Sequence, residues 1–404
     1  MISVDQARGE VLAHAQTRAA VRVPLAESLG RVLAEEIRSD IDSPPHDKSL
    51  VDGYAVIASE IDRADVELRV LEQVTAGENP SQPVVPGAAT RIMTGAPLPQ
   101  GANAVVMVEQ TESLRDGEAV VIQTDRASDG QNIMLRGASM REGDIVLRAG
   151  QRVRPIEAGV LAEVGVTSVP TYPLPSVAIL STGNELVPAD KHPAAGQIRN
   201  SNGPMLAALV QRAGGRPVDL GIGRDEASEL AALVERGLGE DVLLLSGGVS
   251  AGVLDLVPQV LAELGVEQVF HKVQLKPGKP LWFGIKQGER HASLVFGLPG
   301  NPVSSLVCFE LFVRPAIAAL AGDRDADLEC RRARLARAHS HRGGRPTYHP
   351  ARLLDRQGDW QVEPLAWQGS ADLRTLADAD CLAYFPPGDR EYQMGDEVDA
   401  YVLG

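Results

Sequence analysis

Carboxylates, lysines and glycine-rich turns alternate through the second half of the chain, between residues 181 and 302. The charged candidates are Glu185, Asp225, Asp255, Lys272, Lys276 and Lys279. Carboxylate oxygens suit a hard divalent cation, most simply Mg²⁺, which bridges protein to phosphate groups. Lysines supply positive charge for a phosphate or another tetrahedral oxyanion. The combination predicts a site for an anionic small molecule that a metal ion helps to hold.

Two turns in this region have the composition of phosphate-binding loops. One is Ser246–Gly–Gly–Val–Ser250 and the other is Gly297–Leu–Pro–Gly–Asn–Pro302. Glycines let backbone N–H groups approach a ligand closely, and the start of a helix adds a positive dipole. The binding candidates from these turns and the neighbouring lysine are Ser246, Gly247, Gly248, Ser250, Lys279, Gly300 and Asn301. Either turn alone is typical of an ordinary strand–helix connection, so the prediction depends on their combination.

These loops follow short apolar runs that predict strands. We expect strands at Val177–Leu180, Pro217–Ile222, Val242–Leu245, Gln268–Lys272 and Leu294–Phe296. We expect helices at Pro204–Arg212, Ala227–Gly237, Asp255–Leu264 and Val303–Leu320. Strands that alternate with helices favour a doubly wound, mostly parallel sheet. Ligands bind such sheets at the carboxyl ends of the strands. The loop that follows each of the five predicted strands is expected to lie there.

The rest of the chain is predicted to be β-rich, so the fold class is α/β plus β-rich subdomains. The 404 residues exceed one ordinary domain. Ser3 and Gln6 form a capping box that predicts a first helix, Ser3–His14. The predicted division has four parts: a linking subdomain (15–40 and 143–165), a β-rich subdomain (41–142), an α/β subdomain (1–14 and 166–323) and a C-terminal β-rich subdomain (324–404).

Charge and composition exclude several classes of protein. The formal net charge of −15 argues against a nucleic-acid or membrane-surface binder. The three cysteines form no CxxC, which favours a reducing compartment over a disulfide framework. No signal peptide is evident, and no run of about 18 apolar residues predicts a membrane span. We therefore expect a cytoplasmic protein.

Common catalytic motifs are missing or weak. No GxGxxG opens a strand–helix unit, and no GxxxxGK[ST] occurs. Gly248–Val–Ser–Ala–Gly252 matches the GxSxG of hydrolases, with Asp255 and His271 downstream. Ser246–Gly–Gly precedes it and makes a loose loop rather than one strained turn. A hydrolase is therefore the less favoured alternative.

An arginine-rich run and two histidines lie in the C-terminal part. For the arginines between Arg324 and Arg337, a solvated strand face is favoured over a binding patch. His339 and His341 flank Ser340 in a segment that we expect to be a surface strand. None of the eight histidines shows the spacing of metal ligands.

Taken together, six ordered strings resemble the molybdopterin molybdenumtransferase family, which includes MoeA and the gephyrin E domain. The strings are Ser49–Leu–Val–Asp–Gly–Tyr–Ala55, Arg91–Ile–Met–Thr–Gly–Ala–Pro97, Ser181–Thr–Gly–Asn–Glu–Leu186, Ser246–Gly–Gly–Val–Ser250, Lys276–Pro–Gly–Lys–Pro280 and Gly297–Leu–Pro–Gly–Asn–Pro–Val–Ser304. Their order over some 250 residues makes the resemblance specific, and it covers nearly the whole chain.

The resemblance implies the insertion of molybdate into adenylylated molybdopterin, with metal-dependent release of AMP. It implies an elongated homodimer whose active site is shared between protomers, and a molybdopterin adenylyltransferase that acts upstream. By motif position the implied catalytic residues are Asp52, Thr94, Glu185, Lys272, Lys276, Pro299 and Pro302. Asp225 and Asp255, with Glu185, would hold Mg²⁺ or another divalent cation. The two lysines would hold molybdate, and the prolines would shape the loop around it.

Departures from the family pattern leave alternatives open. The family's Arg-Gly-Glu-Asp is Arg136–Gly–Ala–Ser139 here, so two acids are missing, and Asn184 replaces an aspartate. A diverged paralogue with impaired activity, a non-enzymatic scaffold and a molybdopterin adenylyltransferase are the alternatives. Adenylyl transfer would leave residues 1–165 without a role.

Overall fold

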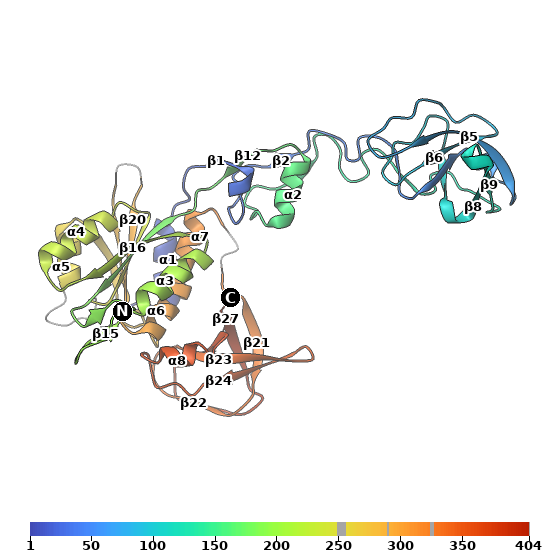
Figure 1. Cartoon of the computed structure of the whole chain (residues 1–404). Helices are drawn as coiled ribbons and strands as arrows, with labels where there is room; N and C mark the ends of the chain where they lie inside the picture. Colours follow the sequence, from blue (N-terminus) through green and yellow to red (C-terminus); the bar gives the residue numbers. More distant parts are fainter. Residues whose placement is uncertain (249–255, 289–290, 324–326, 404) are drawn as a thin grey trace. The chain divides into compact units, whose positions relative to one another are not determined.

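The computed structural model describes residues 1–248, 256–288, 291–323 and 327–403. These residues form two compact units (Figure 1). Unit 1 comprises Met1–Ala34, Gly150–Arg154 and Pro170–Gly404, and unit 2 comprises Glu35–Ala149 and Pro155–Val169. This division is coarser than the four-part division expected from the sequence, which stays a prediction.

Unit 1 contains a six-stranded sheet with the order β16-β13-β17-β20-β19-β18. Its strands are β13 (Ser176–Thr182), β16 (Arg216–Gly223), β17 (Val242–Ser246), β18 (Glu267–His271), β19 (Trp282–Lys286) and β20 (Ser293–Leu298). β16, β13, β17 and β20 run parallel, whereas β19 is antiparallel to both of its neighbours. β18 therefore points the same way as β20. The predicted doubly wound sheet is confirmed, with β19 as an additional strand.

Helices cover both faces of this sheet. They are α1 (Val4–His14), α3 (Asn202–Arg212), α4 (Ala227–Gly237), α5 (Leu256–Glu263), α6 (Pro302–Cys308) and α7 (Arg314–Leu320), with the π-helical η5 (Phe309–Val313) between the last two. In Figure 1, α4 and α5 lie on one side and α1, α3, α6 and α7 on the other. Val177 and Ile179 of β13 join the core beneath α1 and α3, while Ala178 and Leu180 join the core beneath α4. Burial on both faces explains the nearly continuous apolar strands.

The capping box predicted for the first helix is confirmed. The Gln6 backbone N–H donates to Ser3 Oγ at 3.1 Å, and the Ser3 N–H donates to Gln6 Oε1 at 3.0 Å. The helix buries Ala7 and Val11 against the α/β core. The N-terminal segment is thus part of the layer that covers one face of the sheet.

The stretch from α6 through η5 to α7 is a long, apolar helical segment. Pro302–Leu320 is long and apolar enough to cross a membrane by length and composition, which the sequence prediction did not anticipate. However, 89% of its most apolar window is buried inside the protein. Such burial is what a core helix of an α/β domain requires, because the helix packs directly on the sheet.

The C-terminal part of unit 1 is a closed barrel with the order β21-β24-β23-β25-β27. Its elements are β21 (Cys330–Leu335), β23 (Thr347–Arg356), β24 (Asp359–Pro364), β25 (Cys381–Phe385) and β27 (Glu397–Val402), with β22 (His339–His341), β26 (Arg390–Tyr392) and the short α8 (Leu373–Leu376) beside them. Leu335, Val362 and Phe385 are part of its buried core.

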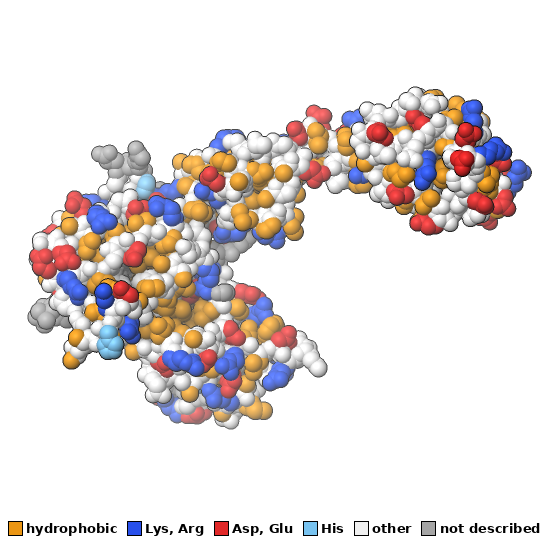
Figure 2. Space-filling model, viewed as in Figure 1, with side chains coloured by type: hydrophobic (Ala, Val, Ile, Leu, Met, Phe, Trp, Pro, Cys, Tyr) orange, Lys and Arg blue, Asp and Glu red, His pale blue; other side chains and the backbone are white. Residues whose placement is uncertain are grey.

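The arginine run lies on this barrel among acidic partners. Arg332 pairs with Asp399 at 2.9 Å and with Glu397 at 3.4 Å, both on the adjacent strand. Figure 2 shows basic and acidic side chains interspersed over the barrel surface. These pairs favour the solvated strand face over a binding patch. The strand at His339–His341 is confirmed, but His341 is buried rather than at the surface, and its ring nitrogens are hydrogen-bonded to Gly388 O and Thr347 Oγ1.

Unit 2 is built on a mixed sheet with the order β7-β4-β6-β5-β9-β8. Its strands are β4 (Gly53–Val56), β5 (Val66–Val74), β6 (Ala88–Ile92), β7 (Ala104–Met107), β8 (Thr111–Leu114) and β9 (Ala119–Ile122). Smaller elements are β2 (Ile37–Arg38), β3 (Lys48–Ser49), β10 (Ile133–Met134), β11 (Ile145–Leu147), α2 (Pro155–Glu163) and the single turns η2 (Ala58–Glu60), η3 (Val108–Gln110) and η4 (Arg115–Gly117). The β-rich character predicted for this part is confirmed.

The remaining elements of the chain are short. They are β1 (Val21–Pro24), η1 (Leu25–Glu27), β12 (Ser168–Thr171), β14 (Leu186–Val187) and β15 (Ile198–Arg199). β14 and β15 pair in parallel and form an arm beside the carboxyl end of β13.

Candidate active site

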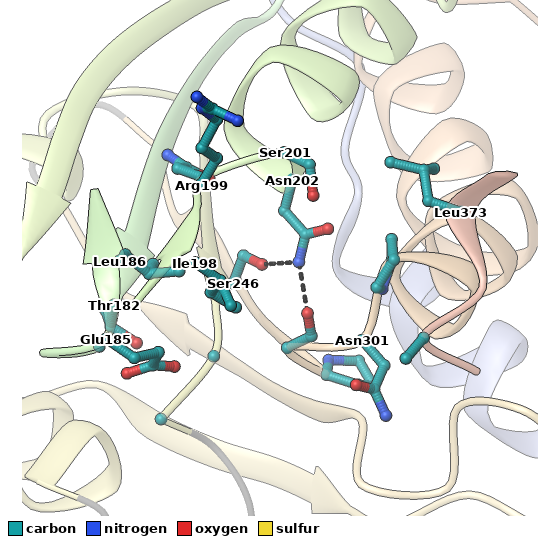
Figure 3. A pocket seen from close by; sticks show the side chains of 18 of the residues that line it. Thr182, Glu185, Leu186, Ile198, Arg199, Ser201, Asn202, Ser246, Asn301 and Leu373 are labelled. Carbon is teal, nitrogen blue, oxygen red and sulfur yellow. Dashed lines mark hydrogen bonds between the residues drawn. The ribbon is translucent and has the colours of Figure 1, made fainter. Parts of the chain in front are cut away.

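A cavity of about 750 Å³ lies at the carboxyl ends of β13, β17 and β20 in unit 1. Figure 3 shows its side chains converging from these strand ends and from the start of α3. The predicted site residues among its lining are Glu185, Asp225, Ser246, Gly247, Gly248, Pro299, Gly300, Asn301 and Pro302. Three neighbouring parallel strands thus deliver their loops to one place, as an open α/β sheet requires.

Glu185 is placed by a tight turn after β13. Gly183 has φ of +144°, a backbone conformation that residues with a side chain rarely adopt, which favours glycine there. The next residue, Asn184, ties this turn to the loop after β16. Its N–H donates to Asp225 Oδ2 at 3.3 Å, and its Oδ1 accepts from the Asp225 N–H at 3.2 Å. Glu185 and Asp225 consequently lie together on the rim of the cavity, both exposed.

These two carboxylates fit a divalent cation that substrate phosphates also bind. Mg²⁺ typically takes one or two protein carboxylates and completes its octahedron with phosphate oxygens and water. Within the described ranges, no three His, Cys, Asp or Glu side chains gather closely enough to hold a metal alone. The two described carboxylates suit a cation that also binds substrate phosphates. Asp255, the third predicted ligand, lies outside the described residues.

The turn after β17 approaches the end of β13 closely. Gly248 has φ of +64°, and a Cβ there would lie 2.8 Å from Thr182 Oγ1. Ser246 is buried, and its Oγ accepts a hydrogen bond from Asn202 Nδ2 at 2.7 Å. Glycine is required at 248 because the two loops leave no room for a side chain between them.

A second cavity of about 380 Å³ adjoins the first, and Pro280, Pro299 and Asn301 line both. Lys276, Lys279 and Arg345 contribute three positive charges to it. Among its described lining residues there is no carboxylate. Ser304, Trp367 and Ser370 complete the polar and aromatic parts of its wall. Its cationic side chains suit an oxyanion, which charge-assisted hydrogen bonds from lysine and arginine can hold.

The C-terminal barrel contributes Arg345, Trp367, Gly369 and Ser370 to this second cavity. Lys276 N–H donates to Pro346 O at 3.0 Å, and Tyr348 N–H donates to Lys276 O at 2.9 Å. Arg345 Nη1 donates to Leu275 O at 2.8 Å. These bonds fix the lysine loop against the barrel and bring Arg345 beside Lys276.

The same barrel also holds the loop after β20. Asn301 Nδ2 donates to Ser370 Oγ at 2.8 Å, and Val303 N–H donates to Ser370 O at 3.1 Å. The Pro299–Pro302 loop is therefore clamped from the barrel side as well as from the sheet. Both cavities depend on its position.

The sequence predicted that the carboxylates and lysines face a single crevice. In the structure they line two adjoining cavities. Glu185 and Asp225 line the first, whereas Lys276 and Lys279 line the second. Lys272 lines neither. It follows β18, which β19 separates from β20, and its backbone bonds to Leu281 O and to the N–H of Ile2.

In unit 2, the implied catalytic pair is directly bonded. Asp52 Oδ1 accepts hydrogen bonds from Thr94 N–H and from Thr94 Oγ1, both at 2.7 Å. These two bonds hold the pKa of Asp52 below its usual value, and the bond from the Thr94 backbone is the larger cause. The carboxylate is exposed and ionised at neutral pH, as a charged site residue requires. A site shared with residues of unit 1 stays a prediction.

Ser139, which stands where the family has an aspartate, also lies in unit 2. Its N–H donates to Ser43 O at 2.9 Å. In the same segment, Asp42 accepts from Glu142 N–H at 2.9 Å and from Arg136 Nε at 2.6 Å, which lowers the pKa of Asp42. Asp42 therefore places a carboxylate beside this segment, and hydrogen bonds from Arg136 and Glu142 hold it in place.

Two predicted site residues lie outside the described residues. They are Ser250 and Asp255, and the GxSxG match at 248–252 falls mostly there too. Their roles stay predictions.

The lining residues that sequence reasoning missed include Asn202, Arg345, Trp367 and Ser370. Asn202 had a weak signal, because the run Asn200–Ser–Asn–Gly203 at a helix start is rich in polar capping residues. The other three lie in the barrel, remote in sequence from the sheet loops that they contact. No local pattern distinguishes them from other loop residues.

Comparison with known proteins first defines the class of the chain. Residues 178–319 match a probable molybdopterin binding domain. Residues 2–165 match the MoeA N-terminal region (domain I and II), and residues 332–403 match the MoeA C-terminal region (domain IV). The chain is thus a molybdopterin-binding α/β domain with the accompanying domains of MoeA proteins.

Full-length relatives then define the family. The molybdopterin molybdenumtransferase of Bacillus subtilis (strain 168) is 33% identical over 408 residues, covering 100% of this chain and 94% of the relative. That of Staphylococcus aureus (strain MRSA252) is 32% identical, covering 98% and 94%. A crystal structure of the molybdopterin biosynthesis moeA protein from Pyrococcus horikoshii OT3 has a TM-score of 0.81 at 30% identity, with 100% of both chains covered. The chain belongs to the molybdopterin molybdenumtransferase family.

Proposed function

We propose that the protein inserts molybdate into adenylylated molybdopterin and releases AMP. The observation that carries this proposal is a pair of adjoining cavities, one with carboxylates at its rim and the other lined by cationic side chains. The first presents Glu185 and Asp225 at its rim, and the second presents Lys276, Lys279 and Arg345. One substrate with a metal-bound pyrophosphate and one tetrahedral oxyanion would together fill both.

The residues of this chain contribute mainly by positioning and charge. Lys276, Lys279 and Arg345 offset the two charges of molybdate next to an anionic pterin dithiolate. Glu185 and Asp225 would hold Mg²⁺, which supplies charge neutralisation at the pyrophosphate when bound. Such preorganised charges lower a barrier because they need no rearrangement as the reaction proceeds. Water cleaves the pyrophosphate linkage, which leaves AMP and the terminal phosphate of the pterin.

Three further features belong to this proposal. A molybdopterin adenylyltransferase would supply the adenylylated substrate. A homodimer would bring Asp52 and Thr94 of one copy to the cavities of the other, since the family resemblance implies a shared site. A cytoplasmic location agrees with the three free cysteines, Cys308, Cys330 and Cys381.

The decisive experiment supplies purified protein with adenylylated molybdopterin, molybdate and Mg²⁺ and follows AMP release. We expect AMP and molybdenum-loaded pterin in equal amounts. Consumption of ATP with free molybdopterin would instead indicate adenylyl transfer. Absence of AMP release from the full chain at saturating substrate and metal would contradict the proposal.

A further inference from the structure

The two cavities share one wall, the loop Pro299–Pro302. Pro299 and Asn301 of this loop line both cavities. On the barrel side, Ser370 holds the loop through Asn301 and Val303. On the sheet side, a side-chain hydrogen bond comes from Asn202, the first residue of α3. Asn202, like Ser305, whose Oγ donates to Pro299 O, is therefore one of the side chains that fix the loop between the cavities.

Asn202 uses both hydrogens of its amide nitrogen. Nδ2 donates to Ser246 Oγ at 2.7 Å and to Gly300 O at 2.7 Å (Figure 3). The side chain is buried, with 8% of the residue exposed. A flipped amide would place Oδ1 against the Gly300 carbonyl, which can only accept, so the orientation is determined. Asn202 thereby joins the end of β17 to the loop after β20.

A second asparagine anchors this bridge to the third strand. Asn200 Oδ1 accepts from Ser181 Oγ at 3.1 Å and from Gly203 N–H at 3.0 Å. The segment between Asn200 and Gly203 thus contacts the carboxyl ends of β13, β17 and β20, which are adjacent in the sheet. Because α3 itself packs on that sheet, the bridge rests on a rigid support.

We propose that Asn202 is a positioning residue that couples the two cavities, by holding Gly300 where a metal-bound nucleotide ligand and a tetrahedral oxyanion can be bound side by side. The inference rests on the proposed function and adds the residue through which occupancy of one cavity affects the other. Its removal leaves each cavity with its own charged groups. Separate binding of either ligand is retained, while their coupling and the transfer between them are lost.

The test compares Asn202→Asp with Gln211→Glu, the same amide-to-acid change at an exposed position of the same helix. An aspartate at 202 keeps the size of the side chain, and Ser246 can still donate to it, but two acceptors then face each other at Gly300. The probes are AMP with Mg²⁺ and molybdate, titrated alone and together by calorimetry. In the unmodified protein we expect AMP to change the molybdate Kd by about fivefold or more.

For Asn202→Ser, which adds no charge to the first cavity, we expect the Kd of each ligand alone to stay within about threefold, and in both Asn202 variants we expect the coupling to fall below about twofold. The kcat for AMP release should fall about a hundredfold, as small displacements of reacting groups cause. Gln211→Glu should match the unmodified protein. Asn202→Ser, which can donate to only one partner, should lose the coupling as well. It keeps the test informative if the aspartate variant does not fold.

The outcomes separate this inference from the proposed function. Retained coupling in both Asn202 variants would overturn the inference, and so would equal molybdate Kd values with and without AMP in the unmodified protein. An equal weakening of both single ligands, with coupling intact, would also overturn it, because that is the effect of a merely structural residue. Failure of AMP release in the unmodified protein would instead count against the proposed function itself.

Discussion

Arg345 of the barrel and Lys276 of the α/β domain line one cavity, although 69 positions separate them in the sequence. The Arg345 guanidinium donates to the carbonyl of Leu275, the residue before the lysine. The barrel therefore contributes a charged group to the site and orients the lysine loop. Under the proposed function, this relationship gives the C-terminal barrel a role in oxyanion binding.

The first prediction concerns these two cations. Lys276→Ala and Arg345→Ala should each weaken molybdate binding by about 2 kcal/mol, roughly thirtyfold, because each removes a charge-assisted bond to the anion. Their effects should not add in the double variant, since both groups contact the same ligand. Calorimetric titration with molybdate measures all three. Lys191→Ala, a lysine in neither cavity, is the control, and an unchanged Kd for Lys276→Ala would refute the assignment.

The second prediction separates the two cavities. Glu185→Gln and Asp225→Asn should raise the Mg²⁺ concentration needed for half-maximal AMP release by about tenfold. Molybdate affinity should stay the same or rise slightly, because these carboxylates line the other cavity and their removal reduces negative charge. A Mg²⁺ titration of AMP release is compared with molybdate calorimetry. If molybdate affinity falls together with metal affinity, the division of roles between the cavities is wrong.

The third prediction concerns Asp52 and Thr94. Thr94→Val removes the hydroxyl bond to Asp52 and keeps the backbone bond, which is the larger cause of the lowered pKa. The pKa of Asp52 should therefore rise only part of the way to its usual value. Carboxyl NMR titration in acid measures it, with Thr111→Val as a control. A full return to the usual value would show that the hydroxyl, rather than the backbone, holds the carboxylate.

The fourth prediction concerns pH and His349 in the barrel. Burial lowers the pKa of His349 from 6.5 to about 4. The unfolded chain therefore binds a proton between these values while the native barrel does not. Stability should be complete above about pH 7 and decline as the pH falls from 6.5 to 4. The loss from this residue is about 3 kcal/mol.

Denaturant unfolding at several pH values tests this expectation. His349→Gln should reduce the slope of stability against pH in that window, although it also weakens packing at every pH. The relevant readout is the slope, not the absolute stability. An identical slope in the variant would mean that other groups cause the acid sensitivity.

The fifth prediction tests the shared site. Asp52→Asn chains mixed with Lys276→Ala chains should regain activity, because a mixed dimer contains one site in which both halves are intact. Each variant alone should be nearly inactive. Tagged copies allow the mixed dimers to be isolated before AMP release is measured. No recovery in isolated mixed dimers would argue against a site that spans two copies.

Local sequence patterns determined much of the scaffold and part of the site. Alternation of apolar strands with amphipathic helices predicted the α/β sheet, because burial on both faces demands it. Glycine and proline at the strand ends predicted the loops at Glu185, Ser246 and Pro299, since only those residue types allow the backbone to turn and approach so closely. The six motif strings indicated the family to which the chain belongs. These signals are short-range and therefore readable along the chain.

The tertiary structure decided which of these groups meet. It placed acids and lysines in separate cavities and left Lys272 outside both. It also brought Ser370 to Asn301, 69 residues away, and Asn202 to Gly300, 98 residues away. Contacts at such separations depend on strand order and on domain docking, and both result from packing of the whole core. Short-range sequence patterns do not encode such contacts, so only the folded chain reveals them.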